Sequence, residues 1–185
     1  MPDIIKILPI EVSNKIAAGE VVQRPSSVLK ELLENSIDAN SSKIKIVIKN
    51  AGKNLIQVID DGQGMSRNDM YKSIIKHATS KINKIDDIYS INSMGFRGEA
   101  LAAIASVSMI EMSSSKLNEN DGYFIEINGG KIISEKELFL NKGTSIKVQN
   151  LFYNIPTRRN FLKSDFVELR HIINVFNSIP LSNNE

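Results

Sequence analysis

Two side chains able to do chemistry, Glu31 and Asn35, stand four residues apart in a segment of helical periodicity. At this spacing two side chains share one face of an α-helix. A carboxylate there can take the proton from an attacking water, and an amide oxygen one turn further on can hold Mg²⁺, which usually keeps several waters and adds phosphate oxygens. The alternative is a solvated helix face, because this pair is common on exposed helices. The pair alone leaves both interpretations open.

A second candidate is Asp60, which ends an apolar, β-branched stretch and leads into a turn that closes with Gly64. An aspartate at a strand end can accept a hydrogen bond from an exocyclic amine such as adenine N6, and the glycines let the backbone approach a ring. The alternative is a simple turn after a strand. Thr144 is similarly open, either as a hydroxyl that completes a base pocket or as a β-branched residue that starts a strand.

A third candidate is the segment Gly95-Phe96-Arg97-Gly98, which precedes an alanine-rich stretch of strong helix formers. Glycine-rich backbone entering a helix offers amides and a dipole to an anion, and Arg97 or Lys81 can add positive charge. A flexible loop is the alternative. Upstream, Thr79, Ser80 and Lys81 are also placed to meet a phosphate.

Standard nucleotide fingerprints do not occur in the chain. The pattern G-x-x-x-x-G-K-[ST] is absent, and the turn 62–64 lacks the third glycine of a dinucleotide-binding loop. The sequence therefore does not support a P-loop enzyme or a Rossmann dehydrogenase.

The elements that must position these residues begin with a helix that follows Arg24-Pro25 and runs to about Ala39. Alternating residues 43–49, a turn at 50–53 and apolar residues 55–60 then predict a β-hairpin. Ser66 is expected to cap a helix running through residues 70, 74 and 75. The first helix should bury the side chains that recur at three- and four-residue spacing, namely Val28, Leu29, Leu32, Leu33 and Ser36.

The second half of the chain predicts one alanine-rich helix at 100–105 and four strands at 107–113, 123–128, 131–134 and 144–150. One helical turn is expected around 86–89, and an amphipathic helix over 166–176 ends before Pro180. Helices separate from antiparallel strands rather than alternating with them. We therefore predict an α+β fold: a two-layer α/β sandwich with a mixed, mostly antiparallel sheet and helices on one face.

Composition limits the classes of protein further. The 185 residues suit one domain, and 42% hydrophobic with 24% charged residues is ordinary globular usage. Zero cysteines and two histidines disfavour zinc, so a metal should be a hard cation held by oxygen. The net charge of +2 does not argue for nucleic-acid binding. No membrane-length apolar stretch or secretory signal occurs, and we expect a cytoplasmic or nuclear protein without a membrane partner.

Taken together and in order, the motifs are similar to those of a known family. Two of them are Ile16-Ala17-Ala18-Gly19-Glu20-Val21-Val22 and Gly95-Phe96-Arg97-Gly98-Glu99-Ala100-Leu101; the others span residues 24–25, 30–39, 60–64, 77–81 and 151–159. They resemble the N-terminal ATPase region of MutL DNA mismatch repair proteins. The first two motifs are specific to MutL within the wider GHKL superfamily of gyrase, chaperone and histidine kinase ATP sites.

This resemblance implies a Bergerat fold that holds ATP between the helices and one face of the sheet, with Mg²⁺ as the metal. It implies that Glu31 is the general base, Asn35 the Mg²⁺ ligand and Asp60 the carboxylate that reads adenine. The other implied nucleotide-contacting residues are Gly64 beside the base, Thr144 supporting the adenine contact, Thr79, Ser80 and Lys81, and Gly95, Phe96, Arg97 and Gly98 in a lid over the phosphates.

The resemblance also implies that residues 1–185 are an N-terminal ATPase domain fragment without the second, transducer domain, which supplies a lysine to the terminal phosphate, and without the C-terminal dimerisation region. We therefore expect this fragment to bind ATP but to hydrolyse it poorly. In the intact protein we expect slow Mg²⁺-dependent hydrolysis to drive clamp closure by N-terminal self-association, in which residues 1–20 take part. A MutS-type mismatch recognition protein and DNA are the other implied partners.

Two alternatives remain at the level of sequence. One is another GHKL ATPase, although a histidine kinase is disfavoured because that group lacks a base one turn before its metal-binding Asn. The other is a DNA-binding scaffold in which nucleotide binding is incidental.

Overall fold

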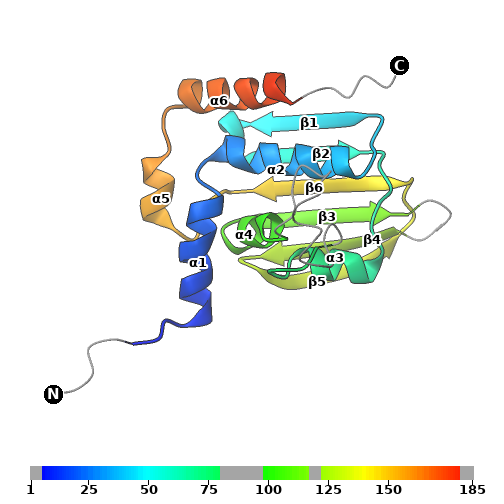
Figure 1. Ribbon diagram of the computed structural model, residues 1–185, viewed down its shortest axis with the longest axis horizontal. Coiled ribbons are helices and arrows are strands. Elements are labelled where there is room, and N and C mark those ends of the chain that lie inside the picture. The colour runs from blue at the N-terminus through cyan, green and yellow to red at the C-terminus, as the bar shows by residue number, and fades with distance from the viewer. Residues whose placement is uncertain (1–5, 80–97, 117–121, 180–185) are drawn as a thin grey trace, which may run out of the picture.

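The computed structural model describes residues 6–79, 98–116 and 122–179. Its strands form one sheet in the order β1-β2-β6-β3-β4-β5, and each pair of neighbours is antiparallel (Figure 1). The strands are β1 (Ile44–Lys49), β2 (Leu55–Asp60), β3 (Met109–Ser115), β4 (Gly122–Asn128), β5 (Lys131–Leu138) and β6 (Gly143–Gln149). The last strand in the chain, β6, thus lies in the middle of the sheet.

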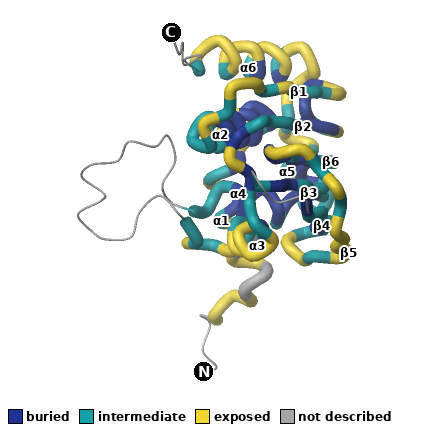
Figure 2. Tube along the Cα trace, turned by 90° about the vertical axis from the view of Figure 1, so that its right-hand side faces the viewer, coloured by how far each residue is buried: buried dark blue, intermediate teal, exposed yellow. Residues whose placement is uncertain are grey.

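The helices of the described residues are α1 (Ile10–Val21), α2 (Pro25–Asp38), α3 (Arg67–Ser73), α4 (Ala100–Ser106), α5 (Pro156–Phe161) and α6 (Asp165–Ser178), with a 3₁₀ turn η1 (Asn50–Gly52). Helices α2, α3 and α4 cover one face of the sheet, α1 packs against α4 beside the ends of the strands, and α6 runs along the β1 edge (Figures 1 and 2). This arrangement confirms the predicted two-layer α+β sandwich.

The core lies between the sheet and its helices. Helix α2 buries the predicted face against the sheet, with Leu29 and Leu32 almost inaccessible and Ile56 and Val58 of β2 beneath them. Burial of each such side chain contributes about 1.5–3 kcal/mol. Because this face is held so firmly, the neighbouring stripe of α2 has a fixed orientation.

Some predicted bounds were wrong. Helix α3 ends at Ser73 rather than continuing through Ile74 and Ile75, and Ile75 is 57% exposed, so a longer helix would bury little. Strand β3 begins at Met109 instead of residue 107 and continues to Ser115. Strand β5 extends to Leu138 because backbone pairing with β4 continues along mostly exposed residues.

Other differences concern the helices at the two ends of the described chain. Helices α1 and α5 were not predicted at all. Helix α6 was predicted and is present, but of its apolar positions Ile172 is buried while Phe166 and Ile173 are exposed. The helical turn expected at 86–89 lies outside the described residues. No helix among the described residues is long and apolar enough to cross a bilayer.

Candidate active site

Three polar side chains form a row across the middle of the sheet at one end of its strands. Asp60 of β2 stands opposite Thr144 of β6, and Thr144 stands opposite Ser114 of β3. Directly opposed residues of antiparallel strands point to the same face. The row therefore brings together two sequence-predicted residues, Asp60 and Thr144, on the face that the helices cover, together with one that was not predicted.

Asp60 is a partly buried carboxylate with partners on both oxygens. Its Oδ2 accepts a hydrogen bond from Ser36 Oγ at 2.9 Å, and its Oδ1 accepts from the Gly62 amide at 3.0 Å. Burial raises the pKa of Asp60 above 3.8, although the hydrogen bonds from Ser36 and Gly62 act in the opposite direction. The Asp60 carboxylate is therefore a hydrogen-bond acceptor in a partly buried place, which suits the recognition of an amino group.

The turn after Asp60 is held by hydrogen bonds from its backbone amides. The Gln63 amide donates to the Ala39 carbonyl at 2.9 Å, and the Met65 amide donates to Ser114 Oγ at 2.8 Å. Gly64 has a φ of +69°, and a Cβ there would lie 1.9 Å from the Ser115 carbonyl oxygen. The close approach of β3 therefore requires glycine at position 64, which is a structural reason that the sequence did not reveal.

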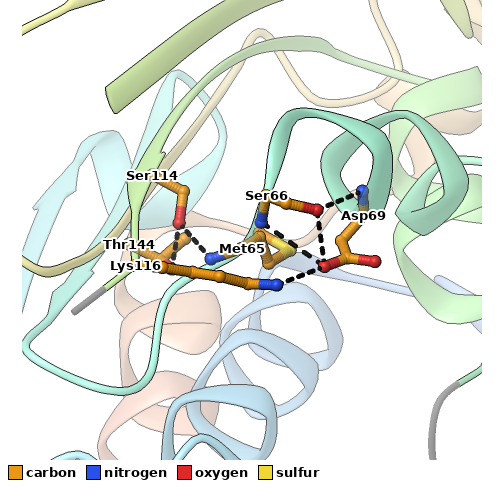
Figure 3. Close-up of polar contacts among 6 residues, drawn as sticks. All are labelled: Met65, Ser66, Asp69, Ser114, Lys116 and Thr144. Atoms are coloured by element: carbon orange, nitrogen blue, oxygen red, sulfur yellow. Dashed lines mark hydrogen bonds and ion pairs between the residues drawn. The ribbon is translucent and has the colours of Figure 1, made fainter. Parts of the chain in front are cut away.

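Helix α3 begins with a capping box that anchors the other end of the same turn. Ser66 Oγ accepts from the Asp69 amide, and the Asp69 carboxylate accepts from Ser66. Lys116, at the end of β3, reaches Asp69 Oδ2 at 3.0 Å (Figure 3). Hydrogen bonds from Ser66 and Lys116 lower the pKa of Asp69, so this carboxylate stays ionised and holds β3 and α3 together.

Glu31 and Asn35 both lie on α2 and are partly buried. Each takes part in further contacts within the protein, so the pair does not match a freely solvated helix face. The next residue after Asn35 is Ser36, whose hydroxyl donates to Asp60 and whose Oγ also lies 3.1 Å from the Leu32 carbonyl oxygen, a second acceptor for the same proton. The residue directly after the predicted metal ligand thus contacts the predicted base-reading carboxylate, and Glu31 precedes Asn35 by about 6 Å along the helix axis.

The predicted phosphate-contacting segments are described only in part. Ser80, Lys81, Gly95, Phe96 and Arg97 lie outside the described residues.

The described ends of these segments, around Thr79 and Gly98, meet. Gly98 has a φ of +61°, and a Cβ there would lie 2.5 Å from the Ala78 carbonyl oxygen. His77 Nδ1 also contacts Glu99 Oε1 at 2.9 Å. The described ends of the two predicted segments therefore lie together.

Two hydroxyls that support this site, those of Ser36 and Ser114, were not predicted from the sequence. Ser36 was assigned only to the buried face of α2, and Ser114 was left beyond the predicted end of its strand. The periodicity of α2 could have flagged Ser36 as a buried polar residue in need of a partner. No comparable signal exists for Ser114, because its neighbour Thr144 is set by the pairing of strands distant in sequence.

Comparison with known proteins assigns the chain to a family. A model described as histidine kinase-, DNA gyrase B-, and HSP90-like ATPase matches residues 23–156. The chain belongs to this ATPase family. It is 56% identical to the DNA mismatch repair protein MutL of Christiangramia forsetii over 98% of this chain, and 51% identical to MutL of Parabacteroides distasonis over 99%. The chain spans about 30% of the length of these curated relatives.

Solved structures agree with the family assignment. The Aquifex aeolicus MutL ATPase domain complexed with ADP is similar with a TM-score of 0.64 and 31% identity, over 84% of this chain and 54% of that one. The N-terminal domain of a DNA repair protein gives a TM-score of 0.73 and 29% identity, over 88% of this chain and 46% of that one. These findings confirm the resemblance to the MutL ATPase region and the GHKL ATPase fold.

Proposed function

We propose that the chain binds ATP with the adenine at the Asp60 end of the sheet, and that the intact protein hydrolyses ATP slowly with Mg²⁺ in DNA mismatch repair. The observation that carries this proposal is the pairing of Asp60 with Thr144 on the helix-covered face, in a chain of this ATPase family. Asp60 accepts from adenine N6, the Thr144 hydroxyl adds a second contact, and the tight turn at Gly64 lies beside the base.

The residues proposed to act at the phosphates lie on α2. Glu31 is the group that takes a proton from the attacking water, and Asn35 offers an amide oxygen to Mg²⁺. The donor set fits Mg²⁺, because one neutral oxygen ligand leaves the remaining positions to water and phosphate oxygens. When bound, Mg²⁺ neutralises phosphate charge. Glu31 and Asn35 are separated by one helical turn, so the proposed base and the proposed metal ligand would act from the same face of α2.

The phosphates themselves lie where the segments around Thr79 and Gly98 meet. The contact of Gly98 with Ala78 supports this placement because it joins the two segments. Ser80, Lys81 and the residues 95–97 stay predictions for the same contact.

The proposal also covers the role of ATP turnover in the intact protein. Turnover in the intact protein drives N-terminal self-association as a clamp, together with a MutS-type mismatch recognition protein and DNA. The relatives named above are bacterial, so the proposed compartment is the bacterial cytoplasm. The chain alone binds ATP and hydrolyses it poorly.

Calorimetric titration of Asp60→Asn with ATP tests the binding site. We expect affinity to fall by about 10- to 100-fold with the fold intact, because a carboxylate hydrogen bond is replaced by an amide of uncertain orientation. Asp61→Asn is the matched control: Asp61 is the neighbouring aspartate, but its carboxylate binds Ser42 and Lys43 outside the row. Equal affinity for Asp60→Asn and the wild type would reassign Asp60.

Steady-state turnover of Glu31→Ala in the full-length protein tests the proposed base. We expect retained ATP binding and a turnover lower by about 10²-fold or more. Glu34→Ala is the control on the same helix, since Glu34 pairs with Lys30 at 3.5 Å. Unchanged turnover would remove Glu31 from the mechanism.

A further inference from the structure

Ser114 is an almost fully buried serine that makes three hydrogen-bonding contacts with one oxygen. Its Oγ lies 2.8 Å from the Met65 amide, 3.0 Å from the Gly143 carbonyl and 2.9 Å from Thr144 Oγ1. Figure 3 shows this oxygen between the Met65 amide and the Thr144 side chain. Ser114 is 1% exposed, so water does not compete for these contacts.

The direction of two of these contacts follows from the chemistry of the partners. An amide N–H only donates and a carbonyl oxygen only accepts, so Met65 donates to Ser114 and Ser114 gives its proton to Gly143. A hydroxyl has one proton and two lone pairs. The third contact is then satisfied only if Thr144 donates to Ser114. The opposite direction would leave Ser114 and Gly143 as two acceptors facing each other at 3.0 Å.

This direction determines what Thr144 can offer to a ligand. Its proton is directed at Ser114, so its oxygen presents lone pairs alone. Asp60 stands opposite Thr144 in the same row and is also an acceptor. The row therefore presents acceptors side by side to whatever binds over it.

We propose that Ser114 is a positioning residue that sets purine specificity through Thr144: it fixes the Thr144 hydroxyl as an acceptor, so that the site favours a 6-amino purine and rejects a 6-oxo purine. This inference rests on the proposed function. The amino group of adenine has two N–H donors, directly or through one water, for two acceptors. A 6-oxo purine places an acceptor there instead, and the site's acceptors are left unpaired, which is the strongest kind of discrimination a polar pocket makes.

Loss of the Ser114 hydroxyl should relax this selection. Without it, the Thr144 hydroxyl is free to turn and to donate to a 6-oxo group. The Met65 amide also loses its acceptor, so some general loss of affinity is expected for every purine. The diagnostic quantity is therefore the ratio of the ATP and ITP dissociation constants, because ITP differs from ATP only by the 6-oxo group and the accompanying proton on N1.

The experiment measures both constants by calorimetry for the wild type, Ser114→Ala, Ser114→Thr and Ser108→Ala. We expect Ser114→Ala to lower the preference for ATP over ITP by about 5- to 10-fold, and Ser114→Thr, which keeps a hydroxyl, to restore most of it. Ser108→Ala is the matched control, because Ser108 is equally buried but donates to the Ile104 carbonyl at 2.6 Å, away from the row. Its ratio should not change.

A double-mutant cycle separates this role from simple support of the turn. In a Thr144→Val background the hydroxyl that Ser114 orients is gone, so Ser114→Ala should leave the ratio unchanged. If Ser114→Ala folds poorly, Ser114→Cys, which is similar in size and a weak hydrogen-bonding group, carries the same expectation. Measurements at pH 7 and pH 8 should agree, which excludes a change in Asp60 protonation.

The outcomes distinguish the two proposals. A well-folded wild type that takes up no ATP overturns the proposed function. The role of Ser114 alone is overturned if the wild type prefers ATP and Ser114→Ala leaves the ratio of the ATP and ITP dissociation constants unchanged. It is also overturned if Ser114→Ala changes that ratio equally in the wild-type and Thr144→Val backgrounds.

Discussion

Two regions differ in how their buried polar atoms are hydrogen-bonded. One is the end of the sheet that carries Asp60, Thr144 and Ser114, called the base-reading end after its proposed role. The other is the flank formed by α1, α5 and the start of α6. Around Asp60, Thr144 and Ser114, buried oxygens have hydrogen-bond partners at 2.8–3.0 Å. On the flank, a cavity of about 760 Å³ is lined in part by Asn154 and Glu168. Each of these two residues has a buried oxygen, Oδ1 and Oε2, without a partner among the described residues.

The flank is also where large apolar side chains face outward. Phe161 is 82% exposed and Phe166 78% exposed. The cavity shares no residue with the predicted nucleotide site. Cavity volume alone therefore favours the flank, whereas the proposed nucleotide site lies at the Asp60 end of the sheet. A small-ligand site is better recognised by several polar groups held in fixed directions toward one place, which Asp60 and Thr144 provide at the base-reading end.

The largest effect should come from breaking the tight turn at the base-reading end. Gly64→Ala forces a Cβ to within 1.9 Å of the Ser115 carbonyl in a left-handed backbone conformation. We expect a loss of about 3 kcal/mol or more in the free energy of unfolding, measured by urea denaturation, together with weaker ATP binding.

Gly129→Ala is the matched control for this substitution. Gly129 also has a positive φ, +57°, but the nearest atom to a Cβ added there is the Tyr153 hydroxyl oxygen at 3.1 Å, a far milder approach than the one at Gly64. We expect a loss of about 1–2 kcal/mol, from the backbone conformation alone. Equal losses at the two glycines would show that the approach of β3 does not constrain the turn.

An intermediate effect is expected on the flank from Arg158→Ala. The Arg158 guanidinium donates to the Gly19 carbonyl and lies 5.2 Å from the centre of the Phe152 ring, so it joins α1 to α5. We expect a loss of about 1–2 kcal/mol in unfolding free energy with unchanged ATP affinity. Arg159→Ala, which removes only an exposed contact to Asn54, is the control. A matching fall in ATP affinity for Arg158→Ala would show that the two regions are coupled.

The smallest effect is expected in the pH dependence of stability. The pKa shifts of the neighbouring residues Asp60 and Asp61 have opposite signs. Burial raises the pKa of Asp60, so its contribution to stability is present below 3.8 and is lost as the pH rises through its folded-state value. Hydrogen bonds from Ser42 and Lys43 lower the pKa of exposed Asp61 to about 2, so its contribution is present above 3.8 and is lost as the pH falls toward 2. Carboxyl NMR titration should give midpoints on opposite sides of 3.8; two midpoints on the same side would remove the distinction.

Local patterns predicted the parts of the molecule that local contacts determine. The spacing of Leu29, Leu32 and Ser36 predicted α2, and alternation predicted the hairpin that ends in Asp60, because each element has one buried face. Among the α1 side chains whose burial is described, Ala18 is the one buried hydrophobic side chain, and Val22 follows at the C-cap, so the helix leaves a weak periodic signal. The opposite error arose at α6, where an apolar stripe was present but remained mostly exposed.

The candidate site was predicted as a set of residues rather than as an arrangement. The motifs gave Asp60 and Thr144 their expected roles, but only the sheet order places these two residues opposite each other. The same order brings Ser114 beside Thr144. Strand register between distant segments depends on the total of their contacts, which no short pattern contains.

The central position of β6 has a consequence for how the protein is made. Thr144 is the last of the three row residues to be synthesised, and β6 must insert between β2 and β3, which are older parts of the growing chain. In a nascent polypeptide, the proposed purine pocket is therefore incomplete until β6 has left the ribosome and paired with both neighbours. If the proposed site is correct, bound nucleotide stabilises the protein only after β6 has joined the sheet.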